Sequence, residues 1–472
     1  MHNRRSGQGV LTRRTLLAVS LTLPLGGFAL AADSAAEQKL FREIYQELVE
    51  INTSHSAGDN TKAANAMAKR LRDAGFAAGD LQLFEPFPRK GNLVLRYKGS
   101  GEKKPMLLVA HLDVVEAKRE DWTTDPFKLQ EEGGYFTARG SIDDKSMASS
   151  FVSILGQLKR EGYVPKRDII LALTADEERG DVPSNGAFWL VNNQRALIEA
   201  EFGINEGGGG ELKDGKPNLN RMQVAEKVFI TYTLETTNSG GHSSQPRPDN
   251  AIDQLNEALT RIAKHAFPVK MSEVTKAYFE RSAAFSSGQE AADMRAVARD
   301  APDPAAVARL SAKPFYNAQF RTTCVTTMVE AGHAENALPQ RAKATVNCRI
   351  LPNDDAAGVE RTMKSLAGDK VAVKHLYPPT LSPPSPLRAD VLGAVEKLTT
   401  QMWPGVPVVP TMSSGATDSR FLRNIGIPVY GVSGLFVEPS DYRAHGLNER
   451  ILVKQLYEGR EFLYRLVREL SN

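Results

Sequence analysis

Short apolar runs that are typical of buried strands alternate along this chain with segments of helical periodicity. The runs NLVLRYKG, KPMLLVAHLDVV, RDIILALTADEE and FGINEGGGG read as strands, and SMASSFVSILGQLKREGY, between the second and the third, reads as a helix. This alternation predicts an α/β layer built on a mostly parallel sheet. The 472 residues are about three times the length of a typical domain, so we expect at least two domains.

The pattern changes near residue 226. KVFITYTLETT alternates like a half-exposed strand, DNAIDQLNEALTRIAKHA is helical, and a polar, alanine-rich stretch over 270–313 leads into two more strand-like runs. This order predicts a smaller α+β lid domain inserted at 226–352, with the α/β domain formed by residues 32–225 and 353–472. The helical segment GVERTMKSLA belongs either to the inserted domain or to the segment that rejoins the α/β domain.

The first 31 residues have the composition of an export signal. Four arginines and no acid are followed by an apolar run and by small residues at Ala29 and Ala31. We therefore expect residues 1–31 to be a signal peptide and the mature protein to be periplasmic or secreted. LTRRTLLA is also compatible with a twin-arginine signal. An uncleaved anchor is the alternative, but the apolar segment is short and contains Pro24, so we expect no stable membrane insertion.

The charge and the cysteine content bear on nucleic-acid binding and on disulfide formation. The formal net charge is only +3 and includes the arginines of the signal, so nothing indicates nucleic-acid binding. The two cysteines, Cys324 and Cys348, are equidistant in sequence from Asn336, and an antiparallel pair turning there would set them opposite each other. Export would allow a disulfide. The sequence leaves this open and slightly favours two buried thiols.

Acids and histidines gather where the strand-like runs end. In open α/β sheets, ligands bind outside the carboxyl ends of the strands. Histidines mixed with carboxylates suit a metal such as Zn²⁺, and two ions that share a carboxylate need about this many ligands. Each motif alone is common in turns or on surfaces, but their order at successive strand ends is not. The candidates are His111, Asp113, Asp143, Asp144, Glu177, Glu178, Glu206 and His445.

The ordered motifs resemble those of metallopeptidase family 20, which includes aminoacylases, carboxypeptidases and dipeptidases. They span residues 109–450, and their spacing is most similar to the carboxypeptidase S and aminoacylase branch. In many relatives a glycine follows Asp-Asp-Lys, whereas this chain has Ser146. The motifs are AHLDVV, ARGSIDDK, DEERGD, NEGG, GGHSSQPRPDNAI, SGATDSRFL and HGLNER.

The resemblance implies a pair of zinc ions, with Co²⁺ or Mn²⁺ as substitutes. His111 would bind one ion, with Asp113 fixing its ring, and Asp143 would bridge both. Glu178 would bind the ion opposite Glu206. His445 would complete the second site. Family members often have a cis peptide after the bridging residue, here between Asp143 and Asp144.

Glu177, which precedes the ligand Glu178, would be the general base and acid. The resemblance implies that it takes a proton from the bridging water and returns it to the leaving amine. Asp113 and Glu177 would thus act beside the metal without replacing the five ligands.

Four residues of the later motifs would contact the substrate. The resemblance implies that His242 stabilises the oxyanion, in many dimeric relatives from the partner subunit. Asn336 and Arg349 match positions that contact substrate, with Arg349 pairing a free carboxylate, and Gly415 lies in a loop whose amides approach it. From the residues alone, His242 could equally be a loop residue and Arg349 a charge on a strand face.

These expectations define one function and two alternatives. We expect an exported di-zinc metallohydrolase that cleaves peptides or N-acyl amino acids carrying a free carboxylate, as a carboxypeptidase, dipeptidase or aminoacylase. The alternatives are a desuccinylase and a non-catalytic, zinc-stabilised periplasmic peptide-binding protein, which would need a missing base or ligand. The sequence leaves the side chain or acyl group open. It also leaves open a homodimer through the lid, or a monomer that 270–313 closes.

Overall fold

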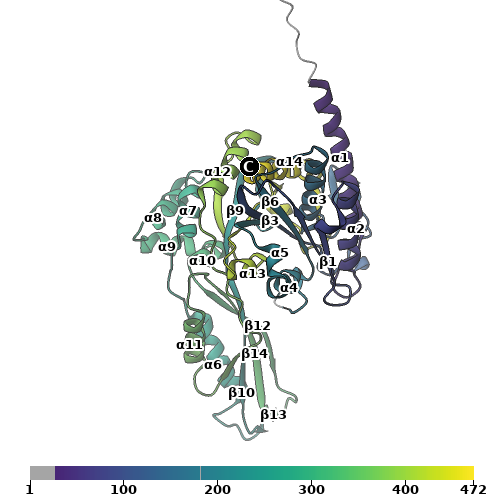
Figure 1. Cartoon of the computed structure of the whole chain (residues 1–472). Coiled ribbons are helices and arrows are strands. Elements are labelled where there is room, and N and C mark those ends of the chain that lie inside the picture. Colours follow the sequence, from purple (N-terminus) through teal and green to yellow (C-terminus); the bar gives the residue numbers. More distant parts are fainter. Residues whose placement is uncertain (1–26, 181) are drawn as a thin grey trace, which may run out of the picture.

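The computed structural model describes residues 27–180 and 182–472 and consists of an α/β domain from which a smaller lid domain projects (Figure 1). The predicted signal peptide lies outside the described residues up to residue 26, and the backbone of 27–31 begins helix α1 (Gly27–Glu50). Among the helices that the structure describes, none combines the length and the apolar character needed to cross a bilayer.

A ten-stranded sheet forms the centre of the α/β domain. Its order is β1-β2-β6-β3-β7-β17-β9-β8-β18, with β16 also paired to β9, and β3 lies between two parallel neighbours. The predicted α/β architecture with a mostly parallel sheet is confirmed. The strands are β1 (Leu81–Phe84), β2 (Asn92–Tyr97), β3 (Lys103–His111), β6 (Arg167–Thr174), β7 (Phe202–Asn205), β8 (Gly210–Lys213), β9 (Lys216–Glu226), β16 (Val408–Ser413), β17 (Val429–Gly431) and β18 (Phe436–Val437).

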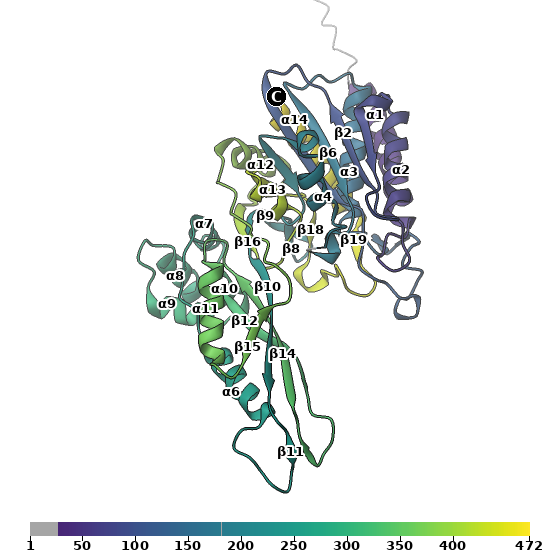
Figure 2. The ribbon, with the colours of Figure 1, turned by 60° about the horizontal axis from the view of Figure 1, so that its bottom comes forward.

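Helices cover both faces of this sheet, which is why its central strands are continuous apolar runs rather than alternating ones (Figure 2). The larger core joins one face to α1, α2 (Asn60–Asp73), α3 (Lys145–Arg160), α12 (Ala389–Met402) and α14 (Val453–Ser471). The smaller core joins the other face to α4 (Gly186–Asn193), α5 (Arg195–Ile198) and α13 (Ser419–Asn424).

A three-stranded sheet closes one end of the α/β domain. It consists of β4 (Gln130–Glu132), β5 (Tyr135–Thr137) and β19 (Arg450–Leu452), and Phe136 packs into a cluster with Phe41 and Tyr45 of α1. Because β19 pairs with β5, the loop before β19 is held beside the loop after β5. These two loops carry His445 and Asp143, which are 302 positions apart in the sequence.

The lid domain is a four-stranded antiparallel sheet in the order β12-β14-β10-β15, with two helices packed on it and a small hairpin-like pair at its tip. The lid domain continues beyond the expected end at residue 352, because β15 pairs with β10 and α11 packs on α6. The elements are β10 (Val228–Thr237), β11 (Gly241–His242), α6 (Ala251–Lys264), β12 (Thr323–Ala331), β13 (Ala337–Leu338), β14 (Arg341–Ile350), α11 (Ala356–Ala367) and β15 (Ala372–His375).

The polar, alanine-rich stretch over 270–313, together with the residues that follow it up to Phe320, forms four short helices that pack on the α/β domain. Its apolar side chains, among them Phe279 and Phe320, share a cluster with Val409 of β16. Arg281 adds an ion pair to Glu396 of α12 at 2.5 Å. The segment therefore covers the large sheet beside β16. The helices are α7 (Glu273–Ser282), α8 (Gly288–Val297), α9 (Pro304–Ser311) and α10 (Pro314–Phe320).

The two cysteines are joined by a disulfide. Cys324 of β12 and Cys348 of β14 are direct partners in the antiparallel register, as their equal spacing from Asn336 suggested. The expectation of two free thiols is therefore wrong. Spacing alone could not decide this, because β12 contains an irregularity between Thr326 and Met328, and a different register would have separated the sulfur atoms.

Candidate active site

Three neighbouring parallel strands carry the predicted ligands to one edge of the sheet. Strand β3 lies between β6 and β7, and the register sets His111 beside Thr174. His111 is the last residue of β3, Glu206 directly follows β7, and Glu177 and Glu178 follow β6 after a short turn. Because parallel strands end at the same edge, apolar runs of the lengths seen here bring these groups together.

The Asp143 carboxylate lies between two imidazoles. Its Oδ1 is 3.0 Å from Nε2 of His111, and its Oδ2 is 3.1 Å from Nε2 of His445. Glu206 lies 3.9 Å from the same nitrogen of His111, and Glu178 lies 2.9 Å from that of His445. These residues form two groups that could each hold a metal ion, and both groups contain Asp143.

The electrostatics of these groups fit a pair of divalent cations. Burial raises the pKa of Glu206 well above its usual range, and it also raises that of Glu178. Hydrogen bonds to Asp143 and Glu178 raise the pKa of His445 to about 10. Crowded, partly buried carboxylates are costly unless positive charge compensates them. Two imidazole nitrogens with three carboxylates form a donor set that suits Zn²⁺ and similar metals.

Asp113 fixes both the first histidine and the turn that carries the glutamate pair. Its backbone oxygen lies 3.0 Å from Nδ1 of His111, which leaves Nε2 to face the other ligands. Its carboxylate accepts hydrogen bonds from the backbone amides of Glu177 and Glu178, both at 3.1 Å. One buried residue therefore orients three of the predicted site residues, His111 through its backbone and the two glutamates through its side chain.

The turn after β6 explains how two adjacent acids face one site. Asp176 has a left-handed backbone with φ of 58°, and the one-turn helix η3 (Glu177–Arg179) follows it. The Asp176 side chain is held by Lys90 at 2.5 Å and by the Ser184 hydroxyl. Because the strand has ended, the Glu178 side chain can reach His445 while the Glu177 side chain lies near Arg420.

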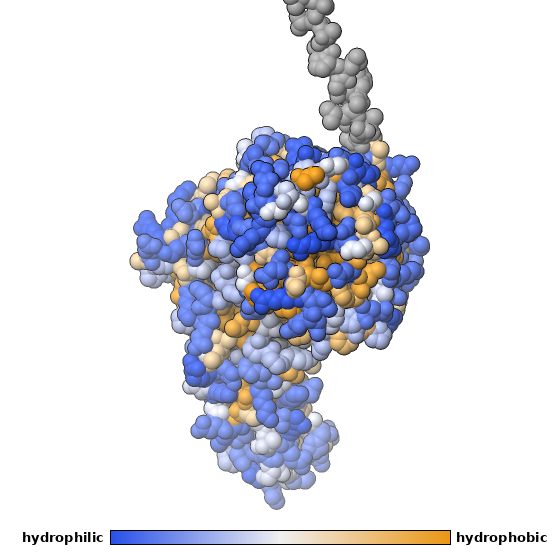
Figure 3. All heavy atoms as spheres, in the orientation of Figure 1, coloured by the Kyte–Doolittle hydropathy of each residue, from blue (hydrophilic) through white to orange (hydrophobic). Residues whose placement is uncertain are grey.

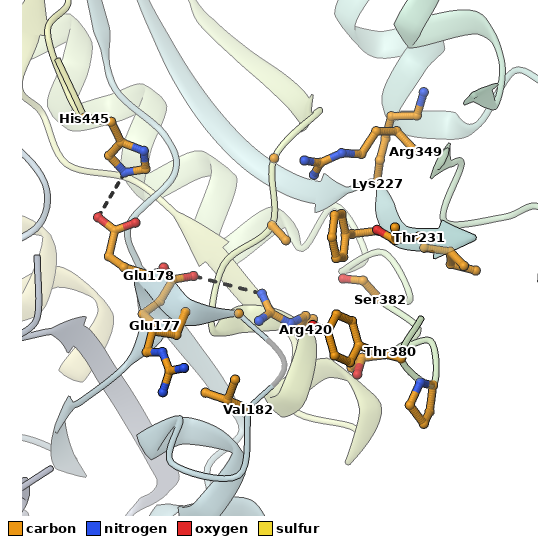
Figure 4. A pocket seen from close by; sticks show the side chains of 18 residues that line it. Glu177, Glu178, Val182, Lys227, Thr231, Arg349, Thr380, Ser382, Arg420 and His445 are labelled. Carbon is orange, nitrogen blue, oxygen red and sulfur yellow. Dashed lines mark hydrogen bonds and ion pairs between the residues drawn. The ribbon is translucent and has the colours of Figure 1, made fainter. Parts of the chain in front are cut away.

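Glu177 is buried close to the ligands without belonging to either group. Burial raises the pKa of Glu177 well above its usual range, while His111 and Arg420 act in the opposite direction. The Arg420 guanidinium lies 4.0 Å from the Glu177 carboxylate, as Figure 4 shows. A carboxyl group with a raised pKa next to a metal site has the properties of a general base and acid.

Sequence reasoning missed two supporting residues of the same loops. The Glu449 carboxylate is fully buried, pairs with Arg139 at 2.7 Å and accepts hydrogen bonds from the backbone amides of Ile142 and Asp143. Glu449 lies in the motif HGLNER. The sequence identifies this motif, but it does not show that Glu449 holds the loop that carries Asp143. The peptide bond between Asp143 and Asp144 is cis, as the family resemblance implied.

A cavity of about 550 Å³ opens from this centre toward the lid domain, and we call it the lid-side cavity. Glu177, Glu178 and His445 line one end of it, and Arg349 lines the other (Figure 4). Gly415 is also among its lining residues. Arg349 stacks over the Phe229 ring and donates to the Ser414 carbonyl at 3.3 Å, and Asn347 accepts its Nε hydrogen. The two predicted substrate contacts Arg349 and Gly415 thus share a cavity with the glutamate pair.

The structure does not bring His242 and Asn336 into this cavity. His242 belongs to β11, which pairs with β13 at the tip of the lid, and the Ser243 amide donates to the Asn336 carbonyl. Figures 1 and 2 place β13 and β11 at the end of the lid that is farthest from the α/β domain. The two residues therefore lie together, but away from the metal-binding groups of their own chain.

Comparisons with known proteins agree with this arrangement. The model described as Peptidase family M20/M25/M40 matches residues 107–469. N-fatty-acyl-amino acid synthase/hydrolase PM20D1 of Homo sapiens is 29% identical over 387 residues, which cover 77% of this chain and 74% of that protein. Probable carboxypeptidase S-like 2 of Dictyostelium discoideum is 29% identical over 392 residues, which cover 80% of this chain and 74% of that protein.

Solved structures show the same fold. The M20 family metallo-carboxypeptidase Sso-CP2 from Sulfolobus solfataricus superposes with a TM-score of 0.69 and 18% sequence identity. The superposition covers 91% of this chain and 99% of that one. The likeness extends over both domains.

The shared position of Asp143 makes metal content a direct test of the centre. We expect the wild-type protein to bind two metal ions, Asp143→Ala to lose both and His445→Ala to lose one, because only Asp143 belongs to both groups. Asp369→Ala, which removes an exposed aspartate, is the matched control and keeps two. The test is the number of metal ions per chain after dialysis, measured by inductively coupled plasma mass spectrometry. Two ions retained by Asp143→Ala would contradict the assignment.

Proposed function

We propose that this chain, which belongs to peptidase family M20/M25/M40, is a di-zinc hydrolase that removes an amino acid with a free carboxylate from a peptide or N-acyl amino acid. Family membership makes it a hydrolase of amide bonds. The observation that carries the finer proposal is the lid-side cavity, which joins the metal-binding groups and Glu177 to Arg349.

Glu177 has the position and environment for proton transfer. It is 9% exposed, it contacts no predicted ligand through an ion pair among the described residues, and its neighbour Glu178 is held against His445. Bound zinc ions would polarise the amide carbonyl and acidify water. Glu177 would accept the proton of the attacking water and deliver it to the leaving amine nitrogen. A non-catalytic binding protein would lack this base or a ligand, and this chain has all of them.

Arg349 supports the recognition of a carboxylate. Burial lowers the pKa of its guanidinium, and among the described residues no acid forms an ion pair with it. Its hydrogen bonds go to the neutral acceptors Ser414 and Asn347. A partly buried cation with only neutral partners gains most from an anionic ligand. Gly415 lines the same cavity, and its backbone amide donates to the Ser413 hydroxyl at 3.0 Å.

The separation of His242 from its own metal-binding groups supports a homodimer. His242 is exposed, and within the described part of the chain its side chain hydrogen-bonds only with Ser244. Asn336 lies beside it. The lid tip is hydrophilic on the face that Figure 3 shows. A polar tip with an exposed imidazole is suited to complete a second site rather than to bury an apolar interface. We therefore propose that His242 and Asn336 act on the partner's site.

Export to an oxidising compartment is supported by two independent features. Residues 1–31 have the composition of a signal peptide, either of the ordinary or of the twin-arginine kind. The Cys324–Cys348 disulfide belongs to a class of bond that persists outside reducing compartments. We propose a periplasmic or secreted protein.

Replacing the proposed base separates catalysis from metal binding. Glu177→Gln should retain both metal ions and lose about 10²–10⁴-fold in kcat, because the amide cannot accept a proton. Glu178→Gln is the control, and we expect it to lose metal as well as activity. Hydrolysis of a dipeptide and an N-acyl amino acid, with metal content measured in parallel, provides the test. Near-normal turnover in Glu177→Gln would rule out its role.

Blocking the substrate carboxylate tests Arg349. The wild-type protein should cleave a free dipeptide at least about thirtyfold better in kcat/KM than its C-terminal amide, the scale expected for a buried charge pair. Arg349→Met should remove this preference. Arg341→Met, which changes an exposed arginine on the same strand, should leave it intact. Equal cleavage of the free and amidated dipeptides by the wild-type protein would refute carboxylate recognition.

Mixed dimers test the proposed contribution of the partner. Glu177→Gln and His242→Ala should each be nearly inactive alone. A refolded equimolar mixture should recover about a quarter of the wild-type activity, because half of the dimers are mixed and one of their two sites is complete. A mixture of Glu177→Gln with Glu178→Gln is the control and should recover none. No recovery in the first mixture would contradict sharing of His242.

Mass spectrometry of the intact protein determines both where the mature chain begins and whether its cysteines are free. Expression with the full N-terminus in a Gram-negative host should give a periplasmic protein that begins at Ala32 and lacks free thiols. Alkylation before and after reduction should add two groups only after reduction. A cytoplasmic protein with an intact N-terminus would contradict the export proposal, and alkylation of two cysteines without reduction would contradict the disulfide.

A further inference from the structure

A second cavity, of about 380 Å³, reaches the metal centre beside the other metal-binding group. Asp143 and Glu206 line it, whereas Glu178 and His445 line the lid-side cavity. The two cavities have no lining residue in common. We call the second one the glycine-run cavity, because the backbone of 207–210 forms part of its wall.

The wall of this cavity away from the metal-binding acids is largely apolar. Of its other polar side chains, Ser433 donates to the Gly208 carbonyl and Arg221 pairs with Glu211. Asp144 adds a third carboxylate next to Asp143, and Tyr442 adds a phenol. The lid-side cavity contains the cations Arg349 and Lys227, and among the described residues neither forms an ion pair with an acid, whereas Arg221 does. The apolar lining consists of Ile142, Met147, Leu435, Val437, Pro439 and Tyr442.

The glycine run packs its backbone closely against neighbouring residues. A Cβ atom on Gly208 would come within 2.1 Å of the Gly431 carbonyl oxygen, and one on Gly210 within 2.2 Å of the Phe436 ring. Gly207 has a φ of +106°, which favours glycine. Neighbouring backbone and aromatic groups therefore require glycine at these positions.

We propose that the glycine-run cavity binds the apolar acyl group of an N-acyl amino acid substrate. This inference rests on the proposed function, because it places the scissile amide at the metal centre with its carboxylate end toward Arg349. The acyl side of the amide must then leave the centre on the side of Asp143 and Glu206, where the apolar cavity begins. A site that is cationic at one end and apolar at the other sets the orientation of such a substrate.

The preferred acyl group should be neutral and several carbons long. A wall that carries three carboxylates, and whose cation Arg221 is already paired with Glu211, offers little to a charged succinyl group, and desolvating another carboxylate there would be costly. Each methylene that enters the cavity should raise kcat/KM about fourfold, the gain expected for transfer of a methylene from water to an apolar site. The chain-length series of substrates therefore reports on this cavity and not on the carboxylate end.

Gly209 offers a way to fill the cavity with little disturbance of the backbone. The nearest atoms to a Cβ at this position are the Leu435 carbonyl oxygen at 3.4 Å and the Ser433 hydroxyl at 3.5 Å, which are ordinary contacts with two residues of the cavity wall. Gly209→Leu should therefore extend a side chain into the cavity. Gly79→Leu is the matched control, because a Cβ there meets no atom within 4 Å and the residue is exposed, outside both cavities.

The test compares N-acetyl-, N-butanoyl-, N-hexanoyl- and N-succinyl-leucine with the zinc-loaded protein. We expect kcat/KM to rise from acetyl to hexanoyl in the wild-type protein and in Gly79→Leu. In Gly209→Leu the hexanoyl-to-acetyl ratio should fall at least tenfold. Val437→Phe, which enlarges a side chain on another wall, should lower the same ratio. Thermal unfolding shows whether each variant is folded. With two variants, a folding defect in one of them leaves the other as the test.

Each outcome separates the acyl site from the proposed function. Cleavage by the wild-type protein with a flat or falling chain-length series, or with a preference for succinyl, overturns the acyl site and leaves the hydrolase intact. An unchanged ratio in folded Gly209→Leu and Val437→Phe also overturns it. Cleavage of free dipeptides but of no N-acyl amino acid would assign the cavity to a peptide side chain instead. Failure to cleave dipeptides and N-acyl amino acids alike would overturn the proposed function itself.

Discussion

The Asp143 carboxylate between His111 and His445 is the interaction on which the site depends. One oxygen faces each imidazole, so this single side chain joins the end of β3 to a loop near the C-terminus. The loop of Asp143 is itself held by Glu449, which lies four residues after His445 and accepts the Asp143 backbone amide. The ligands are therefore not a surface cluster of acids. They are fixed by buried groups that would have no function in a solvated loop.

Positioning by buried acids recurs on the other side of the centre. Asp113 holds the amides of Glu177 and Glu178, and Asp176 is fixed by Lys90 and Ser184. As a result, two adjacent glutamates have different environments. Glu178 meets His445, while Glu177 remains buried near Arg420 with a raised pKa. Environment rather than residue type thus distinguishes the proposed ligand from the proposed base.

The sequence was sufficient for the parts of the site that strand ends determine. Apolar runs end at His111 and before Glu206, and parallel strands end at one edge, so these groups had to meet. It was not sufficient where distant loops or registers decide. Glu449 follows no apolar run, the bond between Cys324 and Cys348 depends on the register of β12, and β15 joins the lid sheet only through pairing with β10. The sequence shows FGINEGGGG only as a strand running into glycines, because the close packing of Gly208 and Gly210 depends on Gly431 and Phe436, far along the chain.

The most direct measurement is a crystal structure of the zinc-loaded protein, with diffraction data collected on both sides of the zinc absorption edge. We expect two anomalous peaks, one contacted by His111 and Glu206 and the other by Glu178 and His445, with an Asp143 oxygen on each. Glu177 should contact neither ion directly. A single peak, or two peaks of which only one is contacted by Asp143, would contradict the account of a shared carboxylate.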